Sequence, residues 1–380
     1  MICDPSNNTA TATLLYQNSQ AVFTQTGAGT ITSQSRKYCI YQPGKSLLCL
    51  ASFVLNTSTS SSTNYNLRVG YFDDYNGIFL QYTKSTSTIS FVVRSGLIGG
   101  TPTDTSYSQS LWNIDKLDGT GNSGISLDFT KAQLLVIDLE WLSVGRVRCG
   151  FMCFGKIVYC HQITNVNSLT GPYMYTANLP VRYQVVNNTT GTAILTKICA
   201  TVVSEGGYRP SGNIFSVSTR KLTSIPNTNE YSVLFLTGNK NPTLNSNYYH
   251  NEVILRSLSI YCATSSDVLQ YRIRLYLPGD SPGGPASSSY ASVASTSVIQ
   301  YYDASNNTTI AGNSIILDQG YVTATAIVNV LENVSDYILN NNSITSSIDN
   351  SQIGYIVVTL QSLSNTGTFD VYVSLNWAEF

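Results

Sequence analysis

Short apolar segments with alternating polar positions recur along the whole chain and predict β-strands. The clearest are an apolar run at residues 132–141 and two alternating segments on either side of the turn Phe154-Gly155. Turns rich in Gly, Pro, Asn and Ser separate such segments at short intervals, which is typical of sandwiches and barrels. Residues 330–339 are at most a short helix. The pattern predicts an all-β fold of tandem antiparallel β-sandwich domains, of jelly-roll or lectin-like type.

The turn at residues 154–155 also predicts a strand register, because a two-residue loop sets which positions face each other. We expect one face of the strand before the turn to be buried, and it carries Val147, Cys149, Phe151 and Cys153. The expected cross-strand pairs are Cys153 with Lys156, Phe151 with Val158, and Cys149 with Cys160.

Breaks in the pattern divide the chain. The Gly-Gly pair at 206–207 and the run PGDSPGGP at 278–285 are the strongest of them. We therefore expect four parts: an N-terminal arm at residues 1–30, a β-sandwich domain at 31–205, a β-rich segment with a linker at 206–285, and a C-terminal β-sandwich domain at 286–380.

Charge is scarce. Of 380 residues only 11% are Asp, Glu, Lys or Arg, where about 25% is usual, and the net charge is -1. This excludes a strongly basic surface for nucleic acid or anionic membrane, and so few like charges suit packing into an assembly. The N-terminal residues do not resemble a signal peptide, and no apolar run reaches the length of a membrane span. We expect a protein made in a cytosol, with no membrane span.

Cysteine and histidine offer little chemistry. Without a secretory signal the eight cysteines are best interpreted as buried free thiols, although Cys149 and Cys160 are near enough for a bridge. Zinc would need Cys160 and His161 together, but strand alternation puts them on opposite faces and no CxxC pair is present. His161 and His250 are the only histidines, and no GxSxG nucleophile motif occurs. We predict no catalytic set, metal or cofactor.

Two carboxylates need a separate explanation. Asp138 and Glu140 alternate onto one face of a predicted strand, as the acids of a sandwich-type glycan hydrolase do. They also match Arg146 and Arg148 on the following strand, and charge pairing across strands accounts for all four residues. We favour the second interpretation.

Loops and tyrosines supply the remaining candidates. Acidic, Gly-rich loops of the kind that bind sugars or calcium contain Asp73, Asp74, Asp118, Asn122 and Asp128, although their spacing does not match an EF-hand. The segment 116–124 lacks the ending of a phosphate loop. Tyrosine is enriched at interfaces, and the tyrosines in loop-like contexts are Tyr173, Tyr175, Tyr248, Tyr249, Tyr301 and Tyr302.

Several collinear motifs carry a family resemblance. They are YQPGKS (41–46), RVGYFDDYNGIFLQ (68–81), SLWNIDKLDGTGNSGISLD (110–128), DLEWLSVGRVRCGF (138–151), GKIVYCH (155–161), ANLPVRY (177–183), ICATVVSEGG (198–207) and LNWAEF (375–380). Over residues 30–380 the chain resembles a family of virus-encoded structural proteins of large DNA viruses and marine phages. The resemblance implies an all-β virion component without enzymatic activity. At residues 161–167 the family carries a further histidine, where this chain has Thr164 and Asn165.

Three functions are therefore considered. The first is a virion structural protein, such as a minor capsid, penton, cement or fibre-type subunit, that packs against other virion proteins and forms a homo-oligomer. The second is a carbohydrate-binding host-attachment protein of the virion, whose partner is a glycan. The third and least favoured is a glycan hydrolase that uses Asp138 and Glu140. Each of the first two places the protein in the virion.

Overall fold

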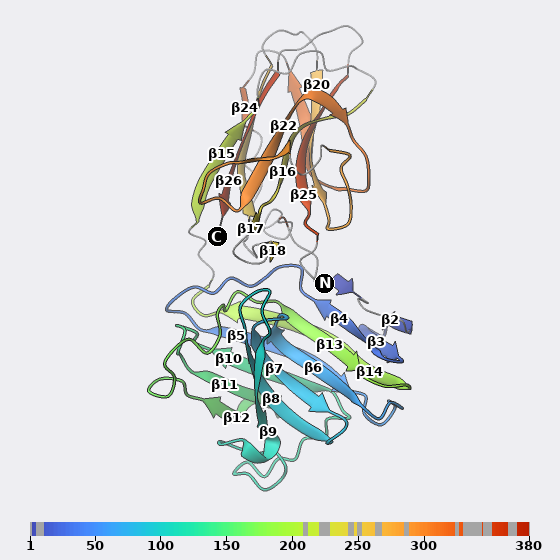
Figure 1. Cartoon of the computed structure of the whole chain (residues 1–380), viewed down its shortest axis with the longest axis vertical. Coiled ribbons are helices and arrows are strands. Elements are labelled where there is room, and N and C mark those ends of the chain that lie inside the picture. Colours follow the sequence, from blue (N-terminus) through green and yellow to red (C-terminus); the bar gives the residue numbers. More distant parts are fainter. Residues whose placement is uncertain are drawn as a thin grey trace. The chain divides into compact units, whose positions relative to one another are not determined.

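The computed structural model divides the chain into two compact units, Met1–Arg209 and Pro210–Phe380 (Figure 1). The residues that it describes are 2–4, 11–207, 212–219, 229–241, 247–248, 253–262, 268–284, 289–323, 327–329, 344, 352–363 and 371–379. All strand pairs among them are antiparallel, which confirms the predicted all-β class. Among the described residues no helix is long and apolar enough to cross a membrane.

The first unit consists of two seven-stranded sheets. In spatial order, the first sheet contains β1 (Ile2–Asp4), β4 (Gly29–Gln34), β13 (Val181–Asn187), β6 (Tyr65–Phe72), β7 (Gly77–Thr83), β8 (Thr88–Ser95) and β9 (Thr103–Ser108). The second contains β12 (Lys156–Ile163), β11 (Val147–Cys153), β10 (Gln133–Leu139), β5 (Leu47–Leu55), β14 (Thr192–Ser204), β3 (Gln20–Thr26) and β2 (Thr11–Gln17). A short 3-10 helix, η1 (Gln109–Leu111), follows β9.

Strand alternation accounts for the core between these sheets. In β5 every second side chain is buried, and so are the inward residues of β6. Both sets belong to one continuous apolar cluster, which includes Leu47, Cys49, Phe53, Leu67, Val69 and Tyr71. Each sheet thus buries one face against the other and turns its outer face away from the core.

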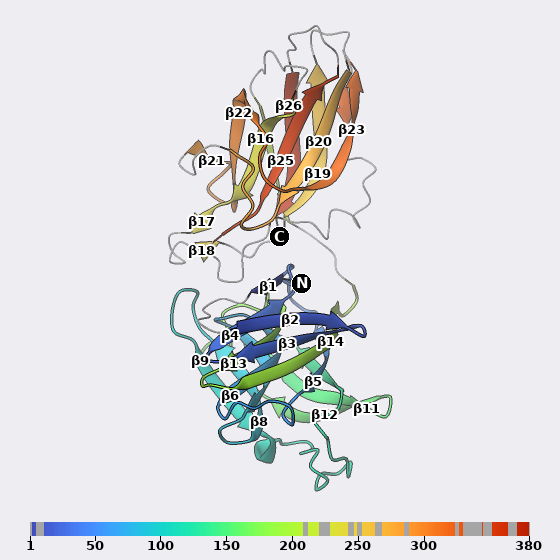
Figure 2. The same cartoon turned by 90° about the vertical axis from the view of Figure 1, so that its right-hand side faces the viewer.

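Residues 11–34 form strands of the sandwich instead of the expected arm. β3 pairs with β14, and β2 pairs with β3 at the edge of the second sheet, so that the three strands lie side by side (Figure 2). Ala21 and Phe23 are buried in the core, which explains why this polar segment is held in the sheet. The alternation of two apolar residues was too short for the sequence to indicate a core strand.

The hairpin of β11 and β12 has the predicted turn, and two of its three predicted pairs are correct. Cys153 faces Lys156 and Phe151 faces Val158, but Cys149 faces His161 because a β-bulge shifts the register between Cys149 and Gly150. Gly150 allows the close approach: a Cβ there would lie 2.3 Å from the carbonyl oxygen of Val158.

The bulge also overturns the argument that strand alternation separates Cys160 from His161. Cys160 becomes the extra residue, and both side chains are buried. The seven cysteines whose side chains the structure describes form no disulfide bond, as predicted, and most of them are buried. The free thiols are Cys39, Cys49, Cys149, Cys153, Cys160, Cys199 and Cys262, of which Cys199 is exposed.

The second unit is also a sandwich. A four-stranded sheet contains β15 (Asn213–Ser218), β26 (Val371–Glu379), β19 (Val253–Cys262) and β24 (Ile327–Asn329). A six-stranded sheet contains β21 (Ala291–Ser292), β22 (Ile299–Thr309), β16 (Tyr231–Gly238), β25 (Tyr355–Ser362), β20 (Val268–Tyr276) and β23 (Ile315–Thr323). A two-stranded sheet contains β17 (Lys240–Asn241) and β18 (Asn247–Tyr248).

These pairings join the two C-terminal parts that the sequence separated. β16 pairs with β22 and β25, and β19 pairs with β26, so strands from 206–285 and 286–380 share both sheets. The described part of the Pro- and Gly-rich run, residues 278–284, is therefore a connection inside one unit. In the last strand every second residue is buried: Val371, Val373, Leu375 and Trp377. The short helix considered at 330–339 lies outside the described residues.

One ion-pair cluster lies at the start of β16, around Glu230. Glu230 accepts hydrogen bonds from Nε and Nη2 of Arg274, at 2.7 and 2.6 Å, and forms an ion pair with Arg272 at 2.8 Å. All three side chains are about 15% exposed. Burial alone would raise the pKa of Glu230, but its hydrogen bonds with Arg274 and Thr359 lower it.

Candidate functional site

The acidic residues of the β6–β7 turn are engaged in the fold. Asp73 accepts hydrogen bonds from the backbone N–H groups of Tyr75 and Asn76, at 2.8 and 2.7 Å, and so shapes the turn. Burial raises its pKa. Asp74 forms an ion pair with the buried Arg182. Both carboxylates therefore have partners within the fold.

The acidic residues of the loop at 115–128 are also used locally. Asp118 accepts from the hydroxyl of Thr120 and Asp128 from that of Thr130, each at 2.6 Å, while Asn122 is exposed. Among the residues that the structure describes, no three His, Cys, Asp or Glu side chains come close enough to hold a metal ion. The structure therefore does not bring these loop residues together.

The predicted tyrosines occupy different environments. Tyr173 is buried, whereas Tyr175 is exposed. Tyr301 and Tyr302 are half-buried, and Tyr302 packs edge-on against Phe235. The side chain of Tyr248 and the whole of Tyr249 lie outside the described residues.

His161 is the one described histidine. Its Nδ1 accepts a hydrogen bond from the backbone N–H of Asn113 at 3.3 Å, and its ring lies 4.7 Å from that of Tyr107. Its Nε2 is buried without a hydrogen-bond partner, and burial lowers the pKa of the imidazole. These contacts fit a neutral ring packed at the rim of the core. His250 lies outside the described part of the chain.

The favoured explanation of the strand carboxylates is confirmed. Asp138 and Arg148 are cross-strand neighbours on β10 and β11, and Asp138 accepts from Nε of Arg148 at 3.0 Å and also from its Nη2. Tyr159 on β12 donates its hydroxyl to the same carboxylate at 2.9 Å. Glu140 pairs with Arg146 at 2.8 Å. The four charged residues thus form two pairs on the outer face of the second sheet.

These two pairs lie in an open groove of about 400 Å³. A row of cross-strand neighbours, Val203, Leu48, Asp138 and Arg148, runs across four strands of the sheet at this point. Three carboxylates and two guanidinium groups line the groove together with one tyrosine and apolar side chains. The lining residues are Ser46, Leu48, Asp138, Glu140, Arg146, Arg148, Ile157, Tyr159, Val203 and Glu205.

The groove is electrostatically balanced and its polar groups are oriented. The guanidinium of Arg148 lies over the ring of Tyr159 at 4.3 Å. Burial alone would lower the pKa of Arg148, but its hydrogen bonds and charge interaction with Asp138 raise it. Burial, and then the same carboxylate, raise the pKa of Tyr159. The sequence analysis named the four charged residues of the pairs but not Tyr159 or Glu205. Tyr159 lies opposite Gly150 in the predicted hairpin, so the hairpin register could have identified it. Glu205 directly follows β14, and the local pattern does not show that β14 pairs with β5.

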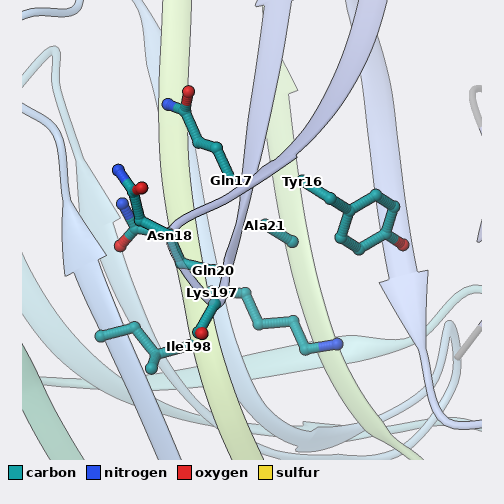
Figure 3. Close-up of a pocket in the computed structure, with 8 residues that line it drawn as sticks. Tyr16, Gln17, Asn18, Gln20, Ala21, Lys197 and Ile198 are labelled. Atoms are coloured by element: carbon teal, nitrogen blue, oxygen red, sulfur yellow. The ribbon is translucent and has the colours of Figure 1, made fainter.

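A second recess of about 350 Å³ lies beside the β2–β3 turn (Figure 3). Asn18 and Ser19 have positive φ values of 51° and 60°, as a tight two-residue hairpin requires. The recess is lined by amide side chains, an exposed tyrosine, and two residues at the bulge of β14. The lining residues are Tyr16, Gln17, Asn18, Ser19, Gln20, Ala21, Lys197 and Ile198. Figure 3 shows Tyr16, Gln17 and Asn18 pointing in different directions, so the recess has no convergent set of polar groups.

No protein-family model matches the sequence, and no curated protein matches it. Among solved structures, the chain is similar to a legume lectin-like domain from Entamoeba histolytica, at 11% identity and a TM-score of 0.31, over 53% of this chain and 89% of that one. It is similar to the alginate lyase AlyC3 at 9% identity and a TM-score of 0.30, over 49% and 75%. It is also similar to the binding domain of botulinum neurotoxin DC in complex with SialylT, at 9% identity and a TM-score of 0.30, over 93% of this chain and 92% of that one. The description of this chain as two antiparallel β-sandwich units rests on its own strand pairing.

Proposed function

We propose that the first unit is a carbohydrate-binding module and that the groove on β10, β11 and β12 is its binding site. One observation carries the proposal. The groove holds two oriented carboxylate–guanidinium pairs and a tyrosine on a rigid sheet face, and it remains open to solvent.

A sugar is the ligand class that such a lining suits. Sugar hydroxyl groups both donate and accept hydrogen bonds, and paired carboxylates and guanidinium groups retain lone pairs and N–H groups for them. Three acids against two guanidinium groups leave the groove close to neutral, which disfavours a strongly charged ligand. The apolar side chains of Leu48, Ile157 and Val203 offer surface for the C–H face of a sugar ring.

Calorimetric titration of the full-length chain with neutral oligosaccharides of glucose, xylose and mannose tests the proposal. Arg146→Gln and Tyr159→Phe should weaken binding of any sugar that the wild type binds, by about ten-fold for a lost charge-assisted hydrogen bond. Lys131→Gln, an exposed cation outside the groove, is the matched control. Asp128→Asn tests the acidic-loop alternative. Wild-type protein that binds none of these sugars would refute the proposal.

Assembly into a virion or homo-oligomer is the second candidate function. Leu15 and Tyr16 on edge strand β2 are 53% and 71% exposed. An exposed apolar edge strand can pair with a strand of another chain. Light scattering at rising concentration, with Leu15→Ser as the variant, measures self-association. A monomer at every concentration, together with absence from purified particles, would argue against this role.

Glycan hydrolysis by Asp138 and Glu140 is the third candidate and the least favoured. Asp138 already accepts hydrogen bonds from Arg148 and Tyr159. Release of reducing ends from the same oligosaccharides measures it directly. Release that persisted in Glu140→Gln would exclude the assigned pair.

A further inference from the structure

The outer face of the first sheet carries a continuous row of polar side chains. Strand register places six residues of six strands next to one another, in the order Thr32, Gln184, Arg68, Gln81, Ser90 and Ser108. Arg68, near the middle of this row, is the only charged member. The row lies on the sheet opposite the groove described above.

Neutral groups hold Arg68 in place. Its Nε donates to the amide oxygen of Gln81 at 2.7 Å, and its Nη1 donates to that of Gln184 at 2.9 Å. Each amide is anchored in turn, by Thr83 at 3.1 Å and by Thr32 at 3.1 Å. The guanidinium also lies 5.7 Å from the centre of the Phe79 ring.

The two neighbouring arginines differ from Arg68 because each has a carboxylate. Arg94 makes two hydrogen bonds of 2.8 Å to Asp104, and Arg182 pairs with Asp74. No carboxylate of a described residue forms an ion pair with Arg68. Of the three guanidinium groups, that of Arg68 thus contacts amides where the other two contact a carboxylate.

An unpaired cation in this position is costly for the fold. Burial, followed by the charge of Arg94, lowers the pKa of Arg68 to about 10, so the side chain is still charged at neutral pH. Proteins usually give such a cation a carboxylate partner, because removing a charge from water is unfavourable. Arg68 instead has two fixed amides, which orient the guanidinium but give it no ion-pair partner among the described residues.

We infer that Arg68 is the receptor for the carboxylate of an acidic sugar bound on the outer face of the first sheet. A guanidinium binds a carboxylate through directed N–H groups, and one guanidinium without a carboxylate in contact matches the single charge of a carboxylate better than the charge of a phosphate. Around Arg68 the face presents half-buried or exposed amide and hydroxyl groups, which suit sugar hydroxyls: Asn66, Thr83, Thr88, Ser106 and Ser108. The inference does not depend on the groove of the second sheet.

Two matched pairs of ligands test it by calorimetry on the full-length chain. Trigalacturonate is compared with its methyl ester, and 3′-sialyllactose with the methyl ester of its sialic acid carboxyl group, so that each pair differs in the charge of the carboxylate. We expect at least one acid to bind about ten-fold or more tightly than its neutral partner. Preference for the first identifies an internal uronate and preference for the second a terminal sialic acid, and either supports the inference. Equal binding within both pairs, or no binding of either acid, overturns it.

Variants of the chain show which residue binds the carboxylate of the sugar. Arg68→Gln should remove the preference for the acid, and Lys131→Gln, which deletes an exposed cation of the same unit, should retain it. Gln81→Glu changes one atom and places a carboxylate beside Arg68, so it should also remove the preference even if Arg68→Gln fails to fold. An unchanged preference in Gln81→Glu overturns the inference. Loss in Arg146→Gln but not in the Arg68 and Gln81 variants also overturns it, and would place the acidic sugar in the groove instead.

Discussion

The buried carboxylate of the groove allows a quantitative test of how the groove is built. Asp138→Asn keeps the shape of the side chain but removes the charge that orients Arg148 and Tyr159. The Asp138 side chain is 10% exposed and that of Arg148 30%, whereas Glu140 and Arg146 are 44% and 39% exposed. The two pairs therefore present the same chemistry at two levels of burial.

The expected magnitude follows from these contacts. A hydrogen bond to a charged group contributes about 1.5–3 kcal/mol, and Asp138 accepts such bonds from Arg148 besides one from Tyr159. Because Arg148 can regain water, we expect Asp138→Asn to lower the free energy of unfolding by about 2–3 kcal/mol, toward the lower end for a broken buried pair. Glu140→Gln, the exposed counterpart, should cost less than about 0.5 kcal/mol.

Urea unfolding followed by tryptophan fluorescence measures both changes, since Trp112 and Trp141 belong to the first unit. A double-mutant cycle of Asp138→Asn with Tyr159→Phe should give a coupling of about 0.5–1.5 kcal/mol, as for other residues in direct contact. Equal costs for Asp138→Asn and Glu140→Gln would show that burial does not set the strength of these pairs. The oriented groove would then lose its physical basis.

Three further predictions concern the fold. Glu230→Gln should destabilise the second unit by about 3 kcal/mol at pH 7. The difference from wild type should shrink as the pH falls below about 4, because a carboxylate with a lowered pKa loses its contribution to stability when it is protonated. Denaturant titrations at several pH values that showed a constant difference would contradict this. Gly70→Ala should cost about 1–3 kcal/mol, since a Cβ there would lie 2.5 Å from the Ile78 carbonyl oxygen, while Gly171→Ala has open space and should be neutral in thermal unfolding. Iodoacetamide should label exposed Cys199 well before the buried Cys149, whose pKa burial raises, and mass spectrometry of the native protein would reveal any reverse order.

Local pairing could be predicted from the sequence because it depends on period-2 alternation and on short turns. The pairing of Asp138 with Arg148 is of this kind: one short connection joins β10 to β11, and their facing sides carry complementary charge. The turn at Phe154 and Gly155 was predicted because a Gly-containing pair separates two alternating segments, and in the structure both residues adopt positive φ. Two of the three predicted hairpin pairs follow from that turn alone.

Features that depend on distant strands could not be predicted. The bulge before Gly150 moved one pair by a residue, and alternation alone carries no signal for such an insertion. The row around Arg68 joins β13 to β6, although Gln184 and Arg68 are 116 residues apart in the chain. The order of strands in a sheet determines which distant residues become neighbours. That order depends on how the apolar faces of the two sheets pack together, and the local sequence pattern does not show it.

The scarcity of charge makes its placement informative. The chain has 20 basic residues and 21 acidic ones, and each of the four ion pairs between described residues of the first unit includes an arginine of the outer sheet faces or their strand ends. In these pairs each arginine has a carboxylate partner, so neither charge is left without an opposite charge in contact. Arg68 breaks this rule at the centre of a sheet, where two glutamines occupy the positions that acids could have taken. A carboxylate at either position would give Arg68 an ion-pair partner, which the amides do not. The Gln81→Glu variant therefore tests most directly whether a ligand carboxylate binds there.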